Sequence, residues 1–507
     1  MVLSESNFLL CLISISIASV FFFLLKKTSR SYKLPPGPSG LPIVGNMFDL
    51  GDLPHIKMEG MRNQYGPVMW LKIGAINTLV IQSAQAATAF FKNHDANFLE
   101  RVVVEVNRVC NYLQGSLALA PYGNYWRMLR RICSMELFVH SRINNSESIR
   151  RKSVDKMIQW IETHGKKEQG QGIEITRFVF LASFNMLGNL IMSKELAADP
   201  DSTTASEFFD AMMGQVEWSG TPNISDVFPL LRWLDIQGLR RKMKRDMGKG
   251  KEILSTFIKE RIKEQENGRA KGTDFLDVLL AFEGKGKDEP AKLSEHEINI
   301  FILEMFLAGT ETSSSTTEWA LTELLRNPET MARVKAEIAE VVGPNKKFEE
   351  SDIDKVPYMQ AVVKETFRLH PPLPFLLPRK ATQDTKFMGY DVPKGTQIFI
   401  NAWAIGRDPE CWHDPLDFIP ERFIGSKIDF KGLNYELIPF GAGRRMCVGV
   451  PLGHRMVHFV LGTLLHEFNW ELPHNMSSKS IDMTERLGTT VRKLEPLKVI
   501  PNKCKLS

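Results

Sequence analysis

The stretch from Phe440 to Gly449 constrains this chain most, because it places one cysteine inside a glycine-rich loop. It reads Phe-Gly-Ala-Gly-Arg-Arg-Met-Cys-Val-Gly, and a run with helical periodicity follows it. Gly441, Gly443 and Gly449 can take up positive φ and let the backbone approach a flat cofactor closely. Backbone N–H groups around the sulfur and the N-terminus of the following helix would hold Cys447 as a thiolate. Taken alone, the loop is also compatible with a glycine-rich turn that contains an incidental buried cysteine.

The loop resembles the cysteine-ligand signature of the cytochrome P-450 (haem-thiolate monooxygenase) superfamily, F-x-x-G-x-R-x-C-x-G. Its fixed positions are occupied by Phe440, Gly443, Arg445, Cys447 and Gly449, and a match of this density is specific. The resemblance implies that Cys447 is the proximal metal ligand of haem b (iron protoporphyrin IX). It also implies that Phe440, Arg445 and Gly449 belong to the cofactor-binding residues, with Arg445 reaching a propionate. A thiolate axial ligand favours O–O cleavage.

A long helix is predicted to begin at Ser294. Ser294 and Glu297 form a capping-box pattern. Apolar or small residues then recur at spacings of 4, 3, 4 and 3, on one helix face, at Ile298, Ile302, Met305, Gly309 and Thr312. The pattern continues to about Leu325, before Asn327-Pro328 ends it. About 30 residues of helix span roughly 45 Å, enough to cross a whole domain.

The middle of this helix combines a glycine, an acid and an alcohol in Gly309, Glu311 and Thr312. Glycine costs about 1 kcal/mol against alanine inside a helix, which suggests room for a ligand. Taken alone, the segment favours a Thr-rich helix with back-bonding hydroxyls and a surface glutamate. It resembles the family's oxygen-activation motif, A/G-G-x-D/E-T. The resemblance implies that these three residues are catalytic and that Thr312 and Glu311 manage protons.

Trp126 and Arg130 share a helix face at spacing i, i+4. In the family both reach the haem propionates, whereas a core aromatic beside a solvated arginine is the alternative. A buried propionate needs cationic partners. The resemblance implies that Arg130, Arg379 and Arg445 are the cationic partners of the propionates. Arg379 belongs to Pro378-Arg379, which resembles the family's strand after the proline-rich turn.

Glu365 and Arg368 are spaced i, i+3, and Arg422 follows in a Pro-Glu-Arg-Phe sequence. An exposed pair would contribute only a few tenths of a kcal/mol. The three residues resemble the family's Glu–Arg–Arg network, which implies a structural role beneath the haem.

The chain departs from the family pattern just after the Cys signature. The family usually continues its Cys signature to Leu-Ala, and this chain has Leu452-Gly453, which touches no ligand.

The N-terminal residues predict a membrane anchor. Phe8 to Leu25 is 18 residues without a charge, long enough to span hydrocarbon. The cations that follow it are Lys26, Lys27, Arg30 and Lys33. By the positive-inside rule they stay cytosolic. A cleaved signal peptide is disfavoured because Glu5 is the charge that precedes the span and no A-x-A-like site follows. We therefore expect an anchor over 1–30, a proline-rich hinge over 31–45 and a haem-containing monooxygenase domain over 46–507.

Composition limits the partners. Lys+Arg 64 against Asp+Glu 59 gives a net charge of +5, which argues against a nucleic-acid binder. The 6 cysteines are scattered without a C-x-x-C spacing, which suits a reducing compartment. The monooxygenase that the resemblance implies would receive NADPH electrons from a separate flavoprotein reductase, because this chain has no G-x-G-x-x-G after a strand.

Short strands are predicted at Val68–Val80 and Lys386–Ile400, where the residues alternate between turn signals. Most of the remainder has helical periodicity. The resemblance implies a mainly α cytochrome P-450 fold, with a large helical haem domain, a smaller β-rich region and an N-terminal transmembrane helix. The matching motifs cover about residues 34 to 450.

The motifs look most like those of plant microsomal members, above all the subgroup that oxidises monoterpenoids such as geraniol and iridoids. The resemblance implies a single-pass protein of the endoplasmic reticulum membrane with a cytosolic catalytic domain. It would use O2 and NADPH–cytochrome P-450 reductase to oxidise a small apolar substrate. By family position the substrate pocket would be lined by Leu117–Ala120, Met305, Phe306, Ala308, Leu373, Phe375, Leu376 and Leu487. Core packing is the alternative for each.

Other functions stay open. A flavonoid, phenolic or alkaloid hydroxylase would use the same family motifs. An O2-independent isomerase is disfavoured because such enzymes tend to lack the alcohol at the Thr312 position. A catalytically silent haem protein would leave the intact Cys loop and the acid–alcohol pair unexplained.

Overall fold

The computed structural model describes residues 14–16, 32–168, 170–268, 274–286, 288–474 and 476–504. The predicted anchor therefore lies outside the described residues, except for 14–16. Within the described part of the chain, one helix is long and apolar enough to cross a membrane. It is α9 (Ile175–Met192), and 78% of it is buried inside the protein.

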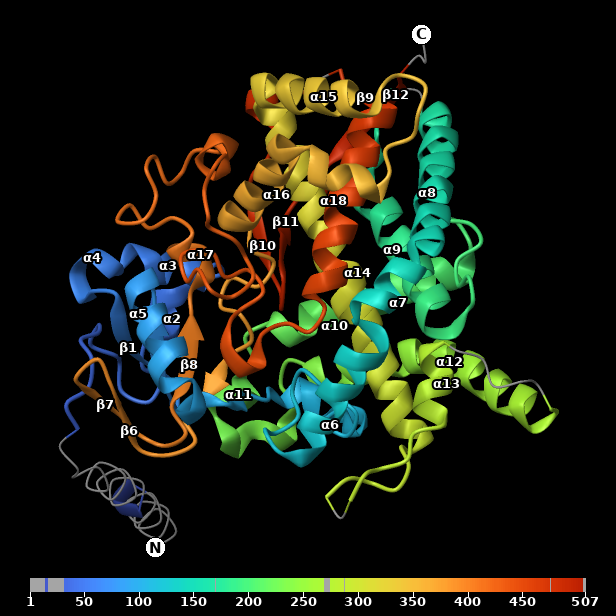
Figure 1. Cartoon of the computed structure of the whole chain (residues 1–507). Coiled ribbons are helices and arrows are strands. Elements are labelled where there is room, and N and C mark those ends of the chain that lie inside the picture. Colours follow the sequence, from blue (N-terminus) through green and yellow to red (C-terminus); the bar gives the residue numbers. More distant parts are fainter. Residues whose placement is uncertain are drawn as a thin grey trace, which may run out of the picture.

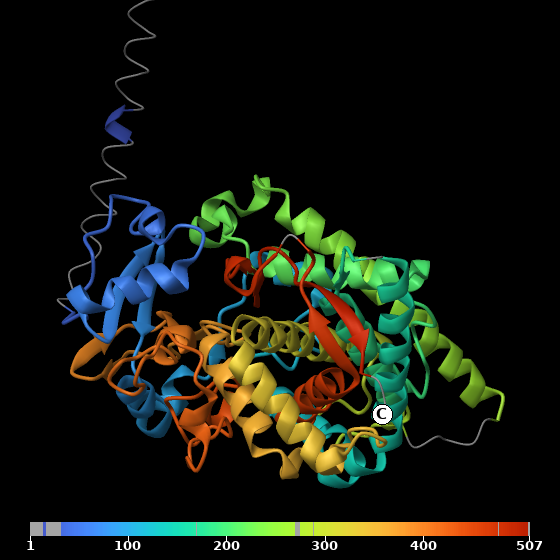
Figure 2. The same cartoon turned by 90° about the horizontal axis from the view of Figure 1, so that it is seen from above.

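A β-rich region forms one side of the molecule. Its main sheet has the order β1-β2-β8-β5-β3 and joins distant parts of the chain. The strands are β1 (Val68–Ile73), β2 (Ile76–Ile81), β3 (Glu100–Arg101), β5 (Arg379–Lys380) and β8 (Gln397–Ile400). Strands β2 and β8 pair in parallel, whereas the other neighbours are antiparallel. Blue and orange segments therefore lie together at the left of Figure 1, and the same region lies to the left of the helices in Figure 2. Both predicted strand regions are confirmed.

The helical region is built around α14 (Glu295–Arg326). Ser294 caps it, and the capping box with Glu297 is present, so the predicted long helix is confirmed. The helices that pack against it are α9, α10 (Thr203–Gly220), α12 (Leu239–Glu266), α16 (Pro357–Leu369) and α18 (Val450–Glu467). In Figure 1, α14 runs beside α18 through the middle of this region. Because neighbours cover most of its length, α14 is buried on several faces rather than along one stripe.

Further helices, turns and strands complete the fold. The other helices are α2 (Met47–Leu50), α3 (Pro54–Gly60), α4 (Arg62–Tyr65), α5 (Ala84–Ala89), α6 (Asn124–Ile132), α7 (His140–Asn145), α8 (Glu147–Lys167), α11 (Ile224–Val227), α13 (Phe275–Leu280), α15 (Pro328–Val342) and α17 (Ala402–Ile405). Short 3₁₀ or π turns are η1 (Phe90–His94), η2 (Asp95–Phe98), η3 (Glu105–Asn111), η4 (Cys133–Leu137), η5 (Pro229–Leu234), η6 (Glu350–Lys355), η7 (Pro420–Phe423), η8 (Gly443–Arg445) and η9 (Ser478–Ser480). The remaining strands are β4 (Ile173–Glu174), β6 (Thr385–Phe387), β7 (Tyr390–Val392), β9 (Phe468–Glu471), β10 (Glu485–Leu487), β11 (Val491–Lys493) and β12 (Lys498–Lys503). The fold is mainly α with a smaller β-rich region, as predicted.

The proline-rich segment is docked on the β-rich region instead of hanging free. The Trp70 N–H donates to the Pro36 carbonyl at 2.9 Å, and the Asp391 N–H donates to the Lys33 carbonyl at 2.8 Å. Gly45 forms a bridge with Ile73. Proline rings leave their carbonyls available to a neighbouring strand, so the segment bonds Trp70 and Asp391 in addition to its own bridge between Leu41 and Gly45.

Candidate active site

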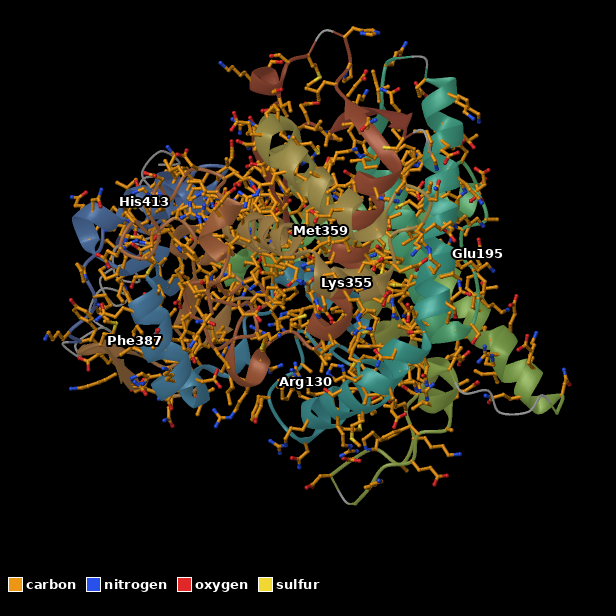
Figure 3. All side chains as sticks on the ribbon, turned by 45° about the horizontal axis from the view of Figure 1, so that its top comes forward. Arg130, Glu195, Lys355, Met359, Phe387 and His413 are labelled. Atoms are coloured by element: carbon orange, nitrogen blue, oxygen red, sulfur yellow. The ribbon has the colours of Figure 1, made fainter. Side chains whose placement is uncertain are left out.

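A cavity of about 320 Å³ lies between the Cys loop (residues 440–449) and α14. The predicted site residues that line it are Trp126, Arg130, Glu311, Thr312, Arg379, Phe440, Arg445 and Cys447. Gly309 and Gly449 are not in its wall. Side chains that are distant in the sequence thus converge on one space, and Figure 3 labels one of them, Arg130 of α6.

The Cys loop closes on itself. The Cys447 N–H donates to the Phe440 carbonyl at 3.0 Å. Gly441 and Gly443 have φ of 69° and 70°, as predicted, and a Cβ on Gly443 would meet Asp95 Oδ1 at 2.5 Å. Gly449 has φ −81°, so the positive φ expected there does not occur. It lies instead at the start of α18, where an ordinary helical φ is needed.

The Cys447 sulfur faces the cavity at the N-terminus of α18. Burial raises the pKa of the Cys447 thiol, while the N–H groups of Gly449 and Val450 and the charge of Arg130 act in the opposite direction. These groups favour the thiolate, but burial outweighs them, so the loop and the helix start do not by themselves hold Cys447 as a thiolate, contrary to the prediction. A bound metal would deprotonate the thiol outright.

Buried arginines gather at one edge of the cavity. Arg379 donates to Asp95 at 2.6 Å and to the Ala442 carbonyl at 3.0 Å. Arg445 donates to the Ala120 carbonyl at 2.7 Å, and its guanidinium lies 4.4 Å from the centre of the Trp126 ring. Burial lowers the pKa of Arg445 to about 10. Such a concentration of buried positive charge requires an anion.

Arg101 belongs to this cluster and was missed by the sequence analysis. It lines the cavity beside Arg379 and Arg445. Burial and then repulsion by these two arginines lower the pKa of Arg101 well below its usual value. No local motif marks Arg101, because it reaches the cluster through the pairing of β3 with β5, where Arg101 faces Arg379.

The residues present fit a haem. Arg101 Nε and Arg445 Nη1 are buried without a hydrogen-bond partner, as expected for donors waiting for carboxylates such as propionates. Cys447, which lines the same cavity, would be the thiolate ligand of the haem.

The acid and the alcohol of α14 point to different partners. Thr312 Oγ1 donates to the Ala308 carbonyl at 2.7 Å. Glu311 is buried and Oε1 accepts from Thr490 Oγ1 at 2.9 Å, with Arg492 Nε at 3.6 Å. Burial raises the pKa of Glu311, and Arg492 and Thr490 oppose this rise. The alternative of a surface glutamate is excluded, although the back-bonding hydroxyl is present.

Gly309 faces away from the cavity. A Cβ at this position would meet Leu187 Cδ1 on α9 at 2.9 Å. The space that the missing side chain leaves is therefore used for close packing of α14 on α9 rather than for a ligand.

The predicted pocket lining is correct in part. Residues found in the wall are Leu117, Ala118, Leu119, Met305, Ala308, Leu373 and Leu376. Residues absent from it are Ala120, Phe306, Phe375 and Leu487. Phe306 packs on Phe184 and Phe208, which is the core-packing alternative. The sequence analysis missed Gln215 of α10 and Met243 of α12, since nothing local indicates which helices cover the cavity.

The predicted charge network is present. Arg368 Nε donates to Glu365 Oε2 at 2.7 Å, and Arg422 Nε donates to Glu365 Oε1 at 3.0 Å. Glu365 and Arg368 are buried, so the pair is not the weak surface pair of the alternative interpretation. It joins α16 to η7 and the loop before it.

A cavity thiol, a cluster of buried arginines and an acid–alcohol pair on a central helix are typical of haem-thiolate oxygenases. The cytochrome P450 family model matches residues 35–499, and the chain belongs to this family. It is a P450 monooxygenase, which implies a haem cofactor, O2, a redox partner and a small organic substrate.

Relatives cover nearly the whole chain. The sequence is 64% identical to "Cytochrome P450 76A2" of Solanum melongena over 96% of both chains. It is 49% identical to "Iridoid oxidase" of Catharanthus roseus over 97% of both. A solved zebrafish cytochrome P450 with progesterone has a TM-score of 0.73 at 24% identity, covering 89% of this chain and 99% of that one. The solved structure confirms the fold.

Proposed function

We propose that this monooxygenase oxidises a small terpenoid alcohol or iridoid at an allylic methyl group. The observation that carries the proposal is the largely apolar lining of the cavity, whose volume of about 320 Å³ has to hold both the haem and the substrate and so suits a small substrate. Its lining includes aliphatic and methionine side chains, such as Leu117, Met243, Met305 and Leu373. The 49% identity with the relative named iridoid oxidase points in the same direction.

Each site residue is assigned one task. Cys447 ligates haem b, while Arg101, Arg130, Arg379 and Arg445 balance its propionates. Haem supplies the activation of O2 when it is bound. Trp126 stacks beside Arg445, and Phe440, which packs at 5.2 Å from Phe367, supports the cofactor from the thiolate side.

Thr312 and Glu311 handle protons in this proposal. Thr312 Oγ1 donates to the Ala308 carbonyl, so its oxygen lone pairs remain free to accept a bond in the cavity. Glu311 Oε2 is buried without a partner, and a rotation of this carboxylate would let it exchange a proton with the cavity. Gly309 contributes through close packing of the helix.

The membrane and the reductase complete the proposal. Residues 1–30 anchor the chain in the endoplasmic reticulum, residues 31–45 form the hinge and residues 46–507 form the cytosolic domain that NADPH–cytochrome P-450 reductase reduces. Leu41 and Ile43 in the hinge and Leu230 and Trp233 in η5 are exposed apolar residues. Both groups flank the β1–β2 turn, since Gly74 N–H bonds the Val44 carbonyl and Ala75 N–H bonds the Val227 carbonyl. An apolar surface of this kind suits a lipid bilayer.

The test is a spectral titration of microsomes that carry the chain and the reductase, followed by product analysis. Geraniol and related monoterpenoids should displace the iron-bound water with similar strengths, because an apolar pocket discriminates only about 10–200-fold per methylene. Turnover of a flavonoid, phenolic acid or alkaloid with no response to any terpenoid would overturn the substrate assignment. The Cys447→Ala variant should lose the long-wavelength Soret band of the reduced CO form, and a retained band would refute the ligand assignment.

A further inference from the structure

Glu304 is a buried carboxylate in the cavity wall that has no task in the proposed function. It lies on α14 one turn before Ala308 and is 4% exposed. Burial raises the pKa of Glu304, and hydrogen bonds from Ser116, Ala118 and Tyr112 oppose the rise. A carboxylate in such a place is costly unless its oxygens are well bonded.

The donors on Glu304 come from one short loop. Oε1 accepts from Tyr112 Oη at 2.9 Å and from Ser116 Oγ. Oε2 accepts from the backbone N–H groups of Leu117 at 2.6 Å and Ala118 at 3.0 Å. Because a carboxylate has about four lone-pair sites, these contacts saturate it and leave no acceptor for a substrate.

The same loop forms part of the cavity wall. Leu117, Ala118 and Leu119 line the cavity. Two side chains from other parts of the protein bond the carbonyls of this loop: Trp126 Nε1 donates to the Leu117 carbonyl at 3.0 Å, and Arg445 donates to the Ala120 carbonyl. Glu304 ties the loop backbone at Leu117 and Ala118 to α14, one turn before Ala308 in the cavity wall.

We infer that Glu304 is a positioning residue that fixes the loop from Leu117 to Leu119 relative to α14 and thereby selects the carbon that is oxidised. The inference rests on the proposed function only in its choice of a monoterpenoid probe. A shift of about 1 Å in a wall can change a rate by about 100-fold. A loosened wall would therefore redistribute oxidation among neighbouring carbons of a flexible substrate.

The two oxygens of Glu304 have different kinds of donor, hydroxyls on Oε1 and backbone N–H groups on Oε2, and this difference predicts how the Glu304→Gln variant behaves. The backbone N–H groups on the Oε2 side can only donate, so the amide oxygen must face them. The hydroxyls of Tyr112 and Ser116 on the other side can rotate and accept from the amide NH2. Glu304→Gln therefore keeps the loop in place without a charge, whereas Glu304→Ala leaves buried donors without an acceptor.

The first readout is independent of any substrate. Hydrogen–deuterium exchange of peptides covering 112–120 should be about tenfold faster or more in Glu304→Ala than in the wild type, and unchanged in Glu304→Gln. The double variant Tyr112→Phe/Ser116→Ala, which keeps the backbone contacts, should be intermediate. Glu297→Ala is the matched control, because Glu297 accepts from Tyr125 Oη at 2.9 Å and caps α14 but does not line the cavity.

The second readout is the ratio of products from geraniol, or from whichever substrate the wild type oxidises if the proposed function fails. The ratio should change about fivefold or more in Glu304→Ala and in the double variant, and stay unchanged in Glu304→Gln and Glu297→Ala. Faster exchange with an unchanged product ratio would refute the positioning role. A Gln variant that behaves like the Ala variant would show that charge, not acceptor geometry, is what matters, and would also overturn the inference.

Discussion

Replacement of Arg368 by alanine tests whether the buried charge network holds the loop between α17 and η7. The guanidinium donates to both Glu365 oxygens at 2.7 Å and to the carbonyls of Gly406 at 2.5 Å, Pro415 at 2.6 Å and Asp417 at 2.9 Å. A planar fork with five donors can serve this set, whereas neither lysine nor alanine can. Arg368 therefore connects α16 to a long loop that has little secondary structure of its own.

The loss in the free energy of unfolding depends on the contacts that Glu365 keeps when Arg368 is removed. Without Arg368, the buried Glu365 carboxylate keeps the Ile419 N–H at 2.8 Å and Arg422 at 3.0 Å. Removal of one partner of a buried pair costs about 3–5 kcal/mol. For a chain of 507 residues, an unfolding entropy of about 2.1 cal/mol/K per residue converts this into a Tm decrease of only about 3–5 °C.

The local effect is much larger. The same free energy applied to opening of residues 406–422 raises the open population by roughly 100-fold to several thousand-fold, since about 1.4 kcal/mol is a factor of ten. Hydrogen–deuterium exchange of peptides from this segment measures that population directly. Arg333→Ala is the control, because Arg333 pairs with Glu421 at 2.8 Å on η7 while both side chains are about half exposed, at 56% and 45%. If exchange of residues 406–422 in Arg368→Ala is no faster than in Arg333→Ala, the reasoning is wrong.

Three further predictions concern the proton relay, a buried histidine and the anchor. Thr312→Ala should bind haem normally, but the product formed per NADPH consumed should fall by roughly tenfold or more relative to the wild type, with hydrogen peroxide released instead. An unchanged ratio of product to NADPH would show that Thr312 has only a structural role in the helix. Burial lowers the pKa of His458 to about 4. In the unfolded chain His458 is protonated below about pH 6.5, whereas in the folded protein it stays neutral down to about pH 4. The free energy of unfolding should therefore fall by about 3 kcal/mol between pH 6.5 and 4. His458→Gln should flatten this decline in denaturant titrations. Deletion of residues 1–30 should release a folded haem domain that sediments only weakly with membranes, while protease protection of the full chain's body would contradict the cytosolic assignment.

The elements that could be predicted are those whose partners are close in sequence. The Cys loop, the capping box of α14 and the Glu365–Arg368 pair each lie within about ten residues, so spacing alone defines their geometry. Arg101 could not be found this way, because the register of β3 on β5 brings it to Arg379. Glu304 reads as one polar residue within the apolar run Ile300–Leu307, and its partners lie in a distant loop.

Gly309 shows a different limit. A glycine inside a helix indicates that something approaches closely, but the sequence does not say whether a ligand or another helix does so. Here Leu187 of α9 fills the space. The same ambiguity explains why Phe306, one turn earlier on α14, packs in the core although it was expected in the pocket.

The spacing of Glu304, Ala308 and Thr312 places three residues of the cavity wall on one face of α14. All three line the cavity, and steps of four residues place them on that face roughly 6 Å apart along the axis. Glu304 fixes the loop opposite, Ala308 is small enough to leave room, and Thr312 presents a hydroxyl. Glu311 lies beside this stripe and bonds Thr490 in the β10–β11 turn. One helix carries all these groups. A change that rotated α14 by one residue, about 100°, would therefore move the residues to which we assign selectivity and those to which we assign proton transfer at the same time. Substitutions within the stripe, by contrast, can alter selectivity while the hydroxyl stays in place.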